Sequence, residues 1–211
     1  MKQSYNERYN RWYDGYIDGV DLSNIEWRRF NYEQLIAFYY QNYYDEDYES
    51  FIMEIDDVND RYERNRFFPI GMTYLTFNKE SKHNEYIVGI AKNKLGLYTI
   101  VASMIFVPKL LIEDDCINAV TYIETVETNK YFQNCGIFKQ MIEVLLRFIN
   151  ANQDILITHE CGVGEKVGVI SIMKKILKEQ NFLGEIRSEY EITEEYLEKL
   201  RGRKVKKKVL K

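Results

Sequence analysis

The spacing of apolar residues predicts helices in the first third of the chain. Asn31, a residue type that often caps a helix, precedes a run rich in apolar residues at positions 35–40. Apolar residues three and four apart predict a second helix over residues 47–60. Residues 1–70 are therefore interpreted as a helical, tyrosine-rich N-terminal extension that packs on the core.

Beyond residue 70 the pattern changes to runs of β-branched and aromatic residues, which predict strands. Strands are predicted at residues 72–77, 86–91 and 98–107, and a turn-like segment joins the last two into a hairpin. The run from Ala119 to Val126 is apolar on both faces, which is typical of a strand in the middle of a sheet.

The last third of the chain alternates helices and strands. In order, they are a helix at 137–150, a strand at 155–159, a helix at 165–180, a strand at 184–192 and a helix at 194–200. These elements predict an α/β (α+β) fold, with helices flanking a mixed, mostly antiparallel central sheet. The predicted core domain spans residues 71–200, and residues 201–211 form a basic tail.

Composition places the chain among ordinary globular proteins. Hydrophobic residues make up 45% of its 211 residues and charged residues 29%, which allows a sizeable core. The net charge of −4 gives no overall attraction to nucleic acid or to a membrane surface. The charge is uneven, because residues 43–60 are acidic and residues 201–211 are basic. The tail is either a solvated terminus or a contact for nucleic acid or an acidic partner.

The cysteines and histidines form no recognisable framework. The three cysteines, at positions 116, 135 and 161, show no CxxC spacing, and the two histidines lie far apart. The sequence therefore predicts neither a metal site nor disulfides. The N-terminus has no apolar signal core, and no apolar run is long enough to span a bilayer. We therefore expect a cytoplasmic protein in a reducing compartment.

A short polar segment, Gln133-Asn134-Cys135-Gly136, lies between the predicted central strand and the helix that begins at Ile137. The first turn of a helix carries unpaired N–H groups and a partial positive charge. A diphosphate can accept hydrogen bonds from those groups. A glycine at position 136 removes a side chain from the point of closest approach, and Gln133 adds a neutral donor.

This segment resembles the signature R/Q-x-x-G-x-G/A of the GNAT superfamily of acyl-CoA N-acyltransferases, which also follows a strand and opens an amphipathic helix. The resemblance spans roughly residues 86–182 by order of elements. It implies that acetyl-CoA is the co-substrate and that the loop holds the CoA pyrophosphate. The residues that would take this role are Gln133, Asn134, Cys135, Gly136, Ile137 and Phe138.

Two features depart from the family pattern. Phe138 stands where the family prefers Gly or Ala, so its side chain either narrows the phosphate site or points into the core. The loop from Val126 to Gln133 is about two residues longer than the usual spacing.

The resemblance also gives roles to the end of the central strand. In the family this strand parts from its neighbour and offers backbone groups to the pantetheine arm of CoA, which assigns Thr125 and Val126 to cofactor binding. A backbone N–H near Val126 would stabilise the oxyanion. Glu124 is the candidate general base, because a carboxylate in an apolar strand is costly unless it is paired or neutralised. Alternatively, Glu124 faces solvent at the strand end or pairs with a lysine.

The family's usual proton donor to the leaving thiolate is not evident. Relatives often carry a tyrosine in the last crossover helix, and the corresponding position here holds Leu177. His159 ends the neighbouring strand at the carboxyl edge of the sheet, so it is a second candidate acid or base. The alternative for His159 is a capping or surface residue.

The sequence leaves three functional hypotheses. The first is an N-acyltransferase that moves an acetyl group from acetyl-CoA directly to the primary amine of a small molecule or peptide. The second is a catalytically degenerate GNAT-fold protein that serves as a binding or regulatory module. The third discards the resemblance and leaves an α/β protein of unknown role. No membrane partner is expected, nucleic acid only through the basic tail, and a homodimer is compatible with the family.

Overall fold

A computed structural model describes residues 17–43, 84–108, 110–112, 115–117, 120–150, 152–158, 168–188 and 191–202. The helix predicted at 47–60, the strand predicted at 72–77 and residues 203–211 of the basic tail lie outside these residues, as does His159. Arg201, the first residue of the predicted tail, is the last residue of a helix. The boundary predicted at residue 70 also lies outside them.

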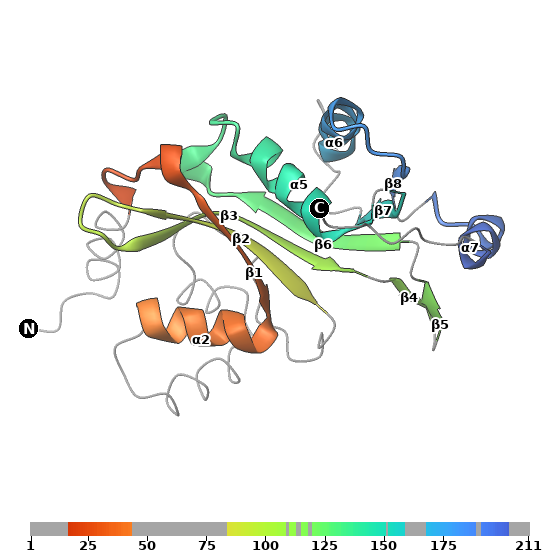
Figure 1. Cartoon of the computed structure of the whole chain (residues 1–211), viewed down its shortest axis with the longest axis horizontal. Helices are drawn as coiled ribbons and strands as arrows, with labels where there is room; N and C mark the ends of the chain where they lie inside the picture. Colours follow the sequence, from red (N-terminus) through yellow and green to blue (C-terminus); the bar gives the residue numbers. More distant parts are fainter. Residues whose placement is uncertain are drawn as a thin grey trace, which may run out of the picture.

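The core of the structure is a six-stranded mixed sheet (Figure 1). Its strands, in spatial order, are β1 (Glu26–Asn31), β2 (Glu85–Lys92), β3 (Tyr98–Val107), β6 (Val120–Thr128), β7 (Asp154–Ile157) and β8 (Ile186–Ser188). The first four are antiparallel neighbours, whereas β6, β7 and β8 run parallel to one another. The predicted α/β class with a mixed, mostly antiparallel sheet is therefore confirmed.

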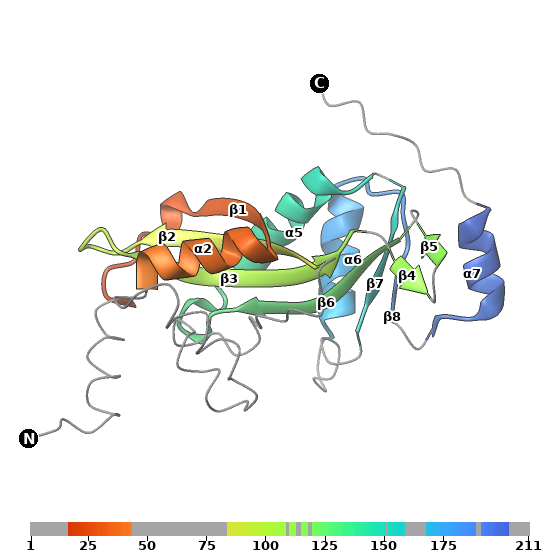
Figure 2. The same cartoon turned by 90° about the horizontal axis from the view of Figure 1, so that it is seen from below.

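Helices cover both faces of the sheet. They are α2 (Tyr32–Tyr43), α5 (Ile137–Phe148), α6 (Val169–Glu179) and α7 (Glu194–Arg201). Helices α5 and α6 lie above the sheet in Figure 1 and α2 lies below it. Figure 2 shows α2 across the first three strands and α7 at the other end of the sheet. Between β3 and β6, a small hairpin joins β4 (Leu110–Ile112) to β5 (Asp115–Ile117).

Alternating side chains of the central strands build a core on each face of the sheet. On the upper face, Met104, Phe106 and Ile123 pack with the apolar stripes of α5 and α6. On the lower face, Tyr86 and Ile105 pack with α2, while other residues of β6 and β7 pack with α7 in a third cluster. Burial on both faces explains why β3 is an almost continuous apolar run.

Most of the described elements fall where the apolar pattern predicted them. The strand predicted at 98–107 coincides with β3, and α5 begins at the predicted Ile137. Helix α2 begins with a capping box, in which the N–H of Gln34 donates to Asn31 Oδ1 (2.8 Å) and the N–H of Asn31 donates to Gln34 Oε1 (3.0 Å). Within the described residues, the strand predicted at 184–192 corresponds to β8, whose residues Ile186–Ser188 pair with β7.

The sequence pattern did not predict β1. Its residues pair antiparallel with β2 from Glu26↔Ile90 to Asn31↔Glu85. The first 70 residues are therefore not purely helical, because they supply an edge strand of the main sheet as well as α2. Among the described residues, no helix is long and apolar enough to cross a membrane.

Candidate functional site

Strands β6 and β7 part in the middle of the sheet. They pair in parallel from Val120↔Asp154 to Ile123↔Ile157, and the backbone N–H of Thr158 then donates to the carbonyl of Ile123 (3.1 Å). Beyond this point β6 continues to Thr128 and, within the described residues, pairs only with β3. One edge of the last five residues of β6 therefore has no strand partner in that part of the chain.

A β-bulge lies at the point of parting. Ile105 of β3 is opposite Thr125, but the next residue, Phe106, is opposite Ile123, so Glu124 is the extra residue of β6. Ile105 faces the α2 side of the sheet and Phe106 faces the α5 side. Since paired residues share a face, the bulge directs both Glu124 and Thr125 toward the α2 side.

Polar contacts from two other segments hold Glu124 in place. The Nδ2 of Asn84, the residue before β2, donates to Glu124 Oε2 at 2.7 Å. The hydroxyl of Thr158 donates to the backbone carbonyl of Glu124 at 2.9 Å. Glu124 is half-buried, so it lies neither in the closed core nor fully in solvent. The apolar surroundings predicted for it are therefore only partly present.

Tyr86 of β2 lies close enough to Glu124 for their electrostatic interaction to matter. The tyrosine is fully buried, and this burial is the main cause that raises its pKa. The charge of Glu124 raises the pKa further, and Tyr32 at the start of α2 adds to the same effect. The hydroxyl of Tyr86 therefore stays protonated at neutral pH.

Asn129 anchors the loop between β6 and α5. Its backbone N–H donates to the carbonyl of Val101 (2.9 Å) and its side-chain Nδ2 donates to the carbonyl of Ile100 (3.1 Å). Its Oδ1 accepts from the N–H of Tyr131 (3.1 Å). The first two bonds fix the longer loop to β3 and the third orders the turn within it, so the start of α5 has a defined position.

The loop ends with two residues in the left-handed region, Asn134 with φ of 65° and Gly136 with φ of 75°. Such a positive φ strains any residue with a Cβ, which explains the glycine at position 136. A Cβ placed on Gly136 would meet nothing within 4 Å among the described residues. The space above Gly136 is therefore open to an approaching group.

The first turn of α5 presents backbone donors next to this space. Gly136 is the N-cap residue and makes no side-chain capping bond, and the first turn contains no acidic residue. The first α-helical bond to Gly136 comes from the N–H of Gln140 (3.3 Å), so the amides of residues 137–139 precede it. The predicted loop residues Gln133, Asn134 and Cys135 are exposed beside these amides.

The structure places Phe138 and Leu177, two residues that depart from the family pattern, against the apolar core. Phe138 is partly buried against the core under α5 and α6, so its side chain packs with Met141 and its neighbours. Leu177 is buried in the same core. Its side chain has no proton to give and packs within the apolar core.

Sequence reasoning missed three residues that contact or face Glu124, namely Asn84, Tyr86 and Thr158. Asn84 and Tyr86 lie at the start of β2, and Thr158 follows the end of β7. Asn84 and Thr158, which hydrogen-bond to Glu124, are 40 and 34 positions away from it. Tyr86 and Thr158 were counted only as strand residues. The sequence offered one indication of a functional role, for Thr158 alone. This residue lies at the carboxyl end of a parallel strand, where sheets of this kind bind ligands.

Comparisons with known proteins do not identify a family for this chain. No protein-family model matches the chain, and no curated protein matches it. Among solved structures, the chain matches AAC(6')-Iy, a GNAT acetyltransferase, in complex with the bisubstrate analog CoA-S-monomethyl-acetylneamine. The identity is 9%, the match covers 89% of this chain and 97% of that chain, and the TM-score is 0.29.

The sheet has the expected mixed order, and its central strand parts from its parallel neighbour as the sequence resemblance implied. The chain also matches a transcriptional regulator from Bacillus halodurans C-125, with 16% identity, coverage of 89% and 98% of the two chains, and a TM-score of 0.26. At these TM-scores, neither likeness carries an argument about activity.

Proposed function

We propose that this chain is an acetyl-CoA-dependent N-acetyltransferase that moves the acetyl group directly to a primary amine. The observation that carries the proposal is the parting of β6 from β7 at Ile123, with a bulged carboxylate, Glu124, at the same point. The part of β6 that extends beyond its described pairing with β7 suits an extended arm with amide groups, and a carboxylate beside it suits proton transfer from an amine.

The residues around Gly136 fit the phosphate end of CoA. The uncapped first turn of α5 offers backbone N–H groups, and the open space above Gly136 admits a group close to the backbone. Thr125 and Val126 lie on the edge of β6 that leads from Glu124 toward this loop. We assign the pantetheine arm to that edge and the pyrophosphate to residues 133–138, as the resemblance implied.

Acetyl-CoA supplies an activated thioester, and the protein must supply a neutral amine beside it. In the proposed reaction Glu124 accepts a proton from the acceptor ammonium group, directly or through water. The neutral amine nitrogen then forms a bond to the acetyl carbon as the C–S bond breaks. The nitrogen releases its remaining surplus proton to water, and water protonates the leaving thiolate. Water takes this last role because Leu177 occupies the position of the family's usual tyrosine donor and is buried.

A catalytically degenerate binding or regulatory module is the second candidate function. The buried Leu177 favours it, since the family's usual acid is absent from the last crossover helix. In that case the protein would bind acetyl-CoA at residues 133–138 but would not consume it. The two candidates therefore share a ligand and differ in turnover.

The first test is thermal unfolding with and without acetyl-CoA. A ligand present at 100 times its Kd stabilises the folded state by about 2.7 kcal/mol, which would raise the Tm of a chain of this size by roughly 5 to 10 °C. Desulfo-CoA and acetate alone serve as controls for the CoA moiety and the acetyl group. No shift at millimolar acetyl-CoA would rule out both candidates.

The second test measures release of free thiol from acetyl-CoA with a panel of amines, which includes polyamines, amino sugars, peptide N-termini and lysine peptides. Turnover with any of these supports the enzyme. We expect Glu124→Gln to lower kcat by about 10²- to 10⁴-fold, the usual contribution of a positioned base, while acetyl-CoA still stabilises the variant. Unchanged turnover in Glu124→Gln would remove Glu124 from the mechanism.

A further inference from the structure

Asn84 reaches Glu124 across an intervening strand. It lies immediately before β2, whereas Glu124 lies in β6, and β3 separates the two strands in the sheet. The bond from Asn84 Nδ2 to Glu124 Oε2 is 2.7 Å long, at the short end of the range for N–H···O bonds to a charged acceptor. The side chain of Asn84 is buried, so it is fixed in place before any ligand arrives.

We infer that Asn84 is the positioning residue of Glu124, the proposed proton acceptor; this inference rests on the proposed function. A β-bulge alone leaves a glutamate side chain with several rotamers, since three torsions separate its carboxylate from the backbone. The bulge sets the direction of Glu124, and Asn84 fixes the end of the side chain. The hydroxyl of Thr158 fixes the backbone of the same residue from the β7 side.

The chemical type of Asn84 suits this role. Its amide donates a hydrogen bond but carries no charge, so it orients the carboxylate without forming an ion pair that would compete with an acceptor ammonium group. The neighbouring Tyr86 is buried and neutral, so it does not form an ion pair with the carboxylate either. Lysine or arginine at position 84 would bind the carboxylate as a counter-ion instead.

The first experiment compares wild type, Asn84→Ala and Asn84→Asp in the amine acetylation assay. We expect kcat to fall by up to about 100-fold in both variants, because a misplaced catalytic group loses most of its orientation advantage. The KM for acetyl-CoA should stay unchanged, because Asn84 bonds to the side chain of Glu124 and not to residues 133–138, which would hold the CoA pyrophosphate. Asn93→Ala is the matched control, because Asn93 is also 6% exposed, follows β2 at the opposite end from Asn84, and accepts hydrogen bonds from the hairpin N–H groups of Leu95 and Leu97.

A double-variant cycle separates positioning from a general structural role. If Asn84 acts through Glu124, then Asn84→Ala has almost no further effect on kcat in a Glu124→Gln background, within about twofold. The fold-changes in kcat caused by Asn93→Ala and by Glu124→Gln should instead multiply in the double variant. Effects of Asn84→Ala and Glu124→Gln that multiply, or a wild-type kcat in Asn84→Ala, would overturn the inference while leaving the proposed function intact.

The exchange variant Asn84→Asp/Glu124→Gln guards against loss of folding. It restores a hydrogen bond with donor and acceptor reversed, so its Tm should return toward that of wild type while kcat stays as low as in Glu124→Gln. A recovery of kcat together with Tm would show that Asn84 only supports the fold, and would overturn the inference.

A measurement without turnover tests the contact itself. The side-chain amide resonances of Asn84 in a ¹⁵N-labelled protein should shift when Glu124 is replaced by glutamine, and those of Asn93 should not. If they respond and no amine is acetylated, the contact stands but the proposed function fails, and the catalytic role of Asn84 fails with it. If they do not respond, the positioning contact is absent and the inference is overturned.

Discussion

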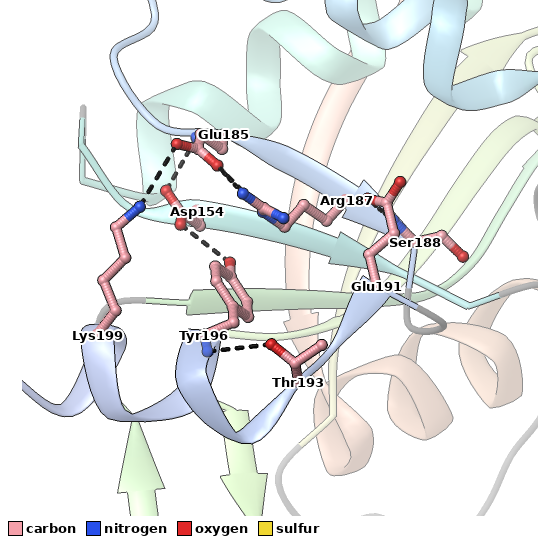
Figure 3. Close-up of polar contacts among 8 residues, drawn as sticks. All are labelled: Asp154, Glu185, Arg187, Ser188, Glu191, Thr193, Tyr196 and Lys199. Carbon is pink, nitrogen blue, oxygen red and sulfur yellow. Dashed lines mark hydrogen bonds and ion pairs between the residues drawn. The ribbon is translucent and has the colours of Figure 1, made fainter.

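The hydroxyl of Tyr196 in α7 donates a 2.9 Å hydrogen bond to the carboxylate of Asp154, the first residue of β7. Asp154 is completely buried, and its other oxygen accepts from the backbone N–H of Glu185 at 2.9 Å. Figure 3 shows these contacts together with Arg187, whose guanidinium lies 4.6 Å from the centre of the Tyr196 ring. One buried carboxylate thus joins β7, the segment that leads into β8, and α7.

We predict that Tyr196→Phe lowers the free energy of unfolding by about 1.5 to 3 kcal/mol, the range for a hydrogen bond to a charged group. The ring keeps its packing in this variant, so the loss reports the hydroxyl alone. Urea unfolding followed by circular dichroism measures it. Asp154→Ala should cost more, because it removes both hydrogen bonds, and the two changes together should cost less than their sum. Strict additivity would contradict a shared contact.

The raised pKa of Tyr196 leads us to predict that the protein loses stability at alkaline pH. Burial is the largest cause that raises the pKa of Tyr196, followed by the charge of Asp154 and its hydrogen bond. The unfolded chain releases the tyrosine proton near pH 10 while the folded chain retains it, so the unfolded state binds fewer protons above that pH. Stability is therefore fully present below about pH 10 and falls as pH rises further.

This pH effect is checked by urea unfolding at intervals from pH 8 to pH 11 in wild type and Tyr196→Phe. The slope of the unfolding free energy against pH should be less steep above pH 10 in the variant, which lacks one titrating phenol. Tyr86→Phe should reduce the slope similarly, because burial also raises the pKa of Tyr86. Parallel curves for wild type and Tyr196→Phe would contradict the prediction.

Gly136→Ala should separate backbone strain from ligand binding. Both Gly136 and Gly96 have a positive φ, 75° and 79°, and a Cβ on either would meet nothing within 4 Å. We expect each alanine variant to lose about 1 kcal/mol of stability from strain alone. Only Gly136→Ala should weaken acetyl-CoA binding, by about tenfold or more, which corresponds to about 1.4 kcal/mol. Calorimetric titration checks this, and equal affinities would place the phosphate elsewhere.

Gly184→Ala is predicted to be strongly destabilising for a different reason. A Cβ on Gly184 would lie 2.2 Å from the carbonyl oxygen of Gln153, so the backbone that leads into β7 or β8 must shift. We expect a loss of about 1 to 3 kcal/mol or more, as for other overpacked sites. Gly202→Ala is the control, since its nearest contact would be an ordinary 3.7 Å. Similar Tm values for the two variants would contradict the prediction.

The local pattern of the sequence determined most helices and strands. The apolar period of α5, its start at Ile137 and the limits of β3 were all predicted, because periodicity depends on neighbours within about one helical turn. The cap of α2 by Asn31 was readable for the same reason. The loop before α5 could also be identified from the sequence, since the strand, glycine and helix that define it are contiguous.

Only the tertiary structure decided the contacts between distant segments. Residues 26–31 lack a regular alternation and contain two arginines, and they form a strand because β2 presents an edge to them. The bulge at Glu124 depends on the register between β3 and β6, which no spacing within either strand specifies. Asn84 and Glu124 are 40 positions apart, and Asp154 and Tyr196 are 42 apart. The two residues of such a pair come into contact only when the sheet has formed. The distance between them in space depends on the fold, and the sequence between them does not specify it.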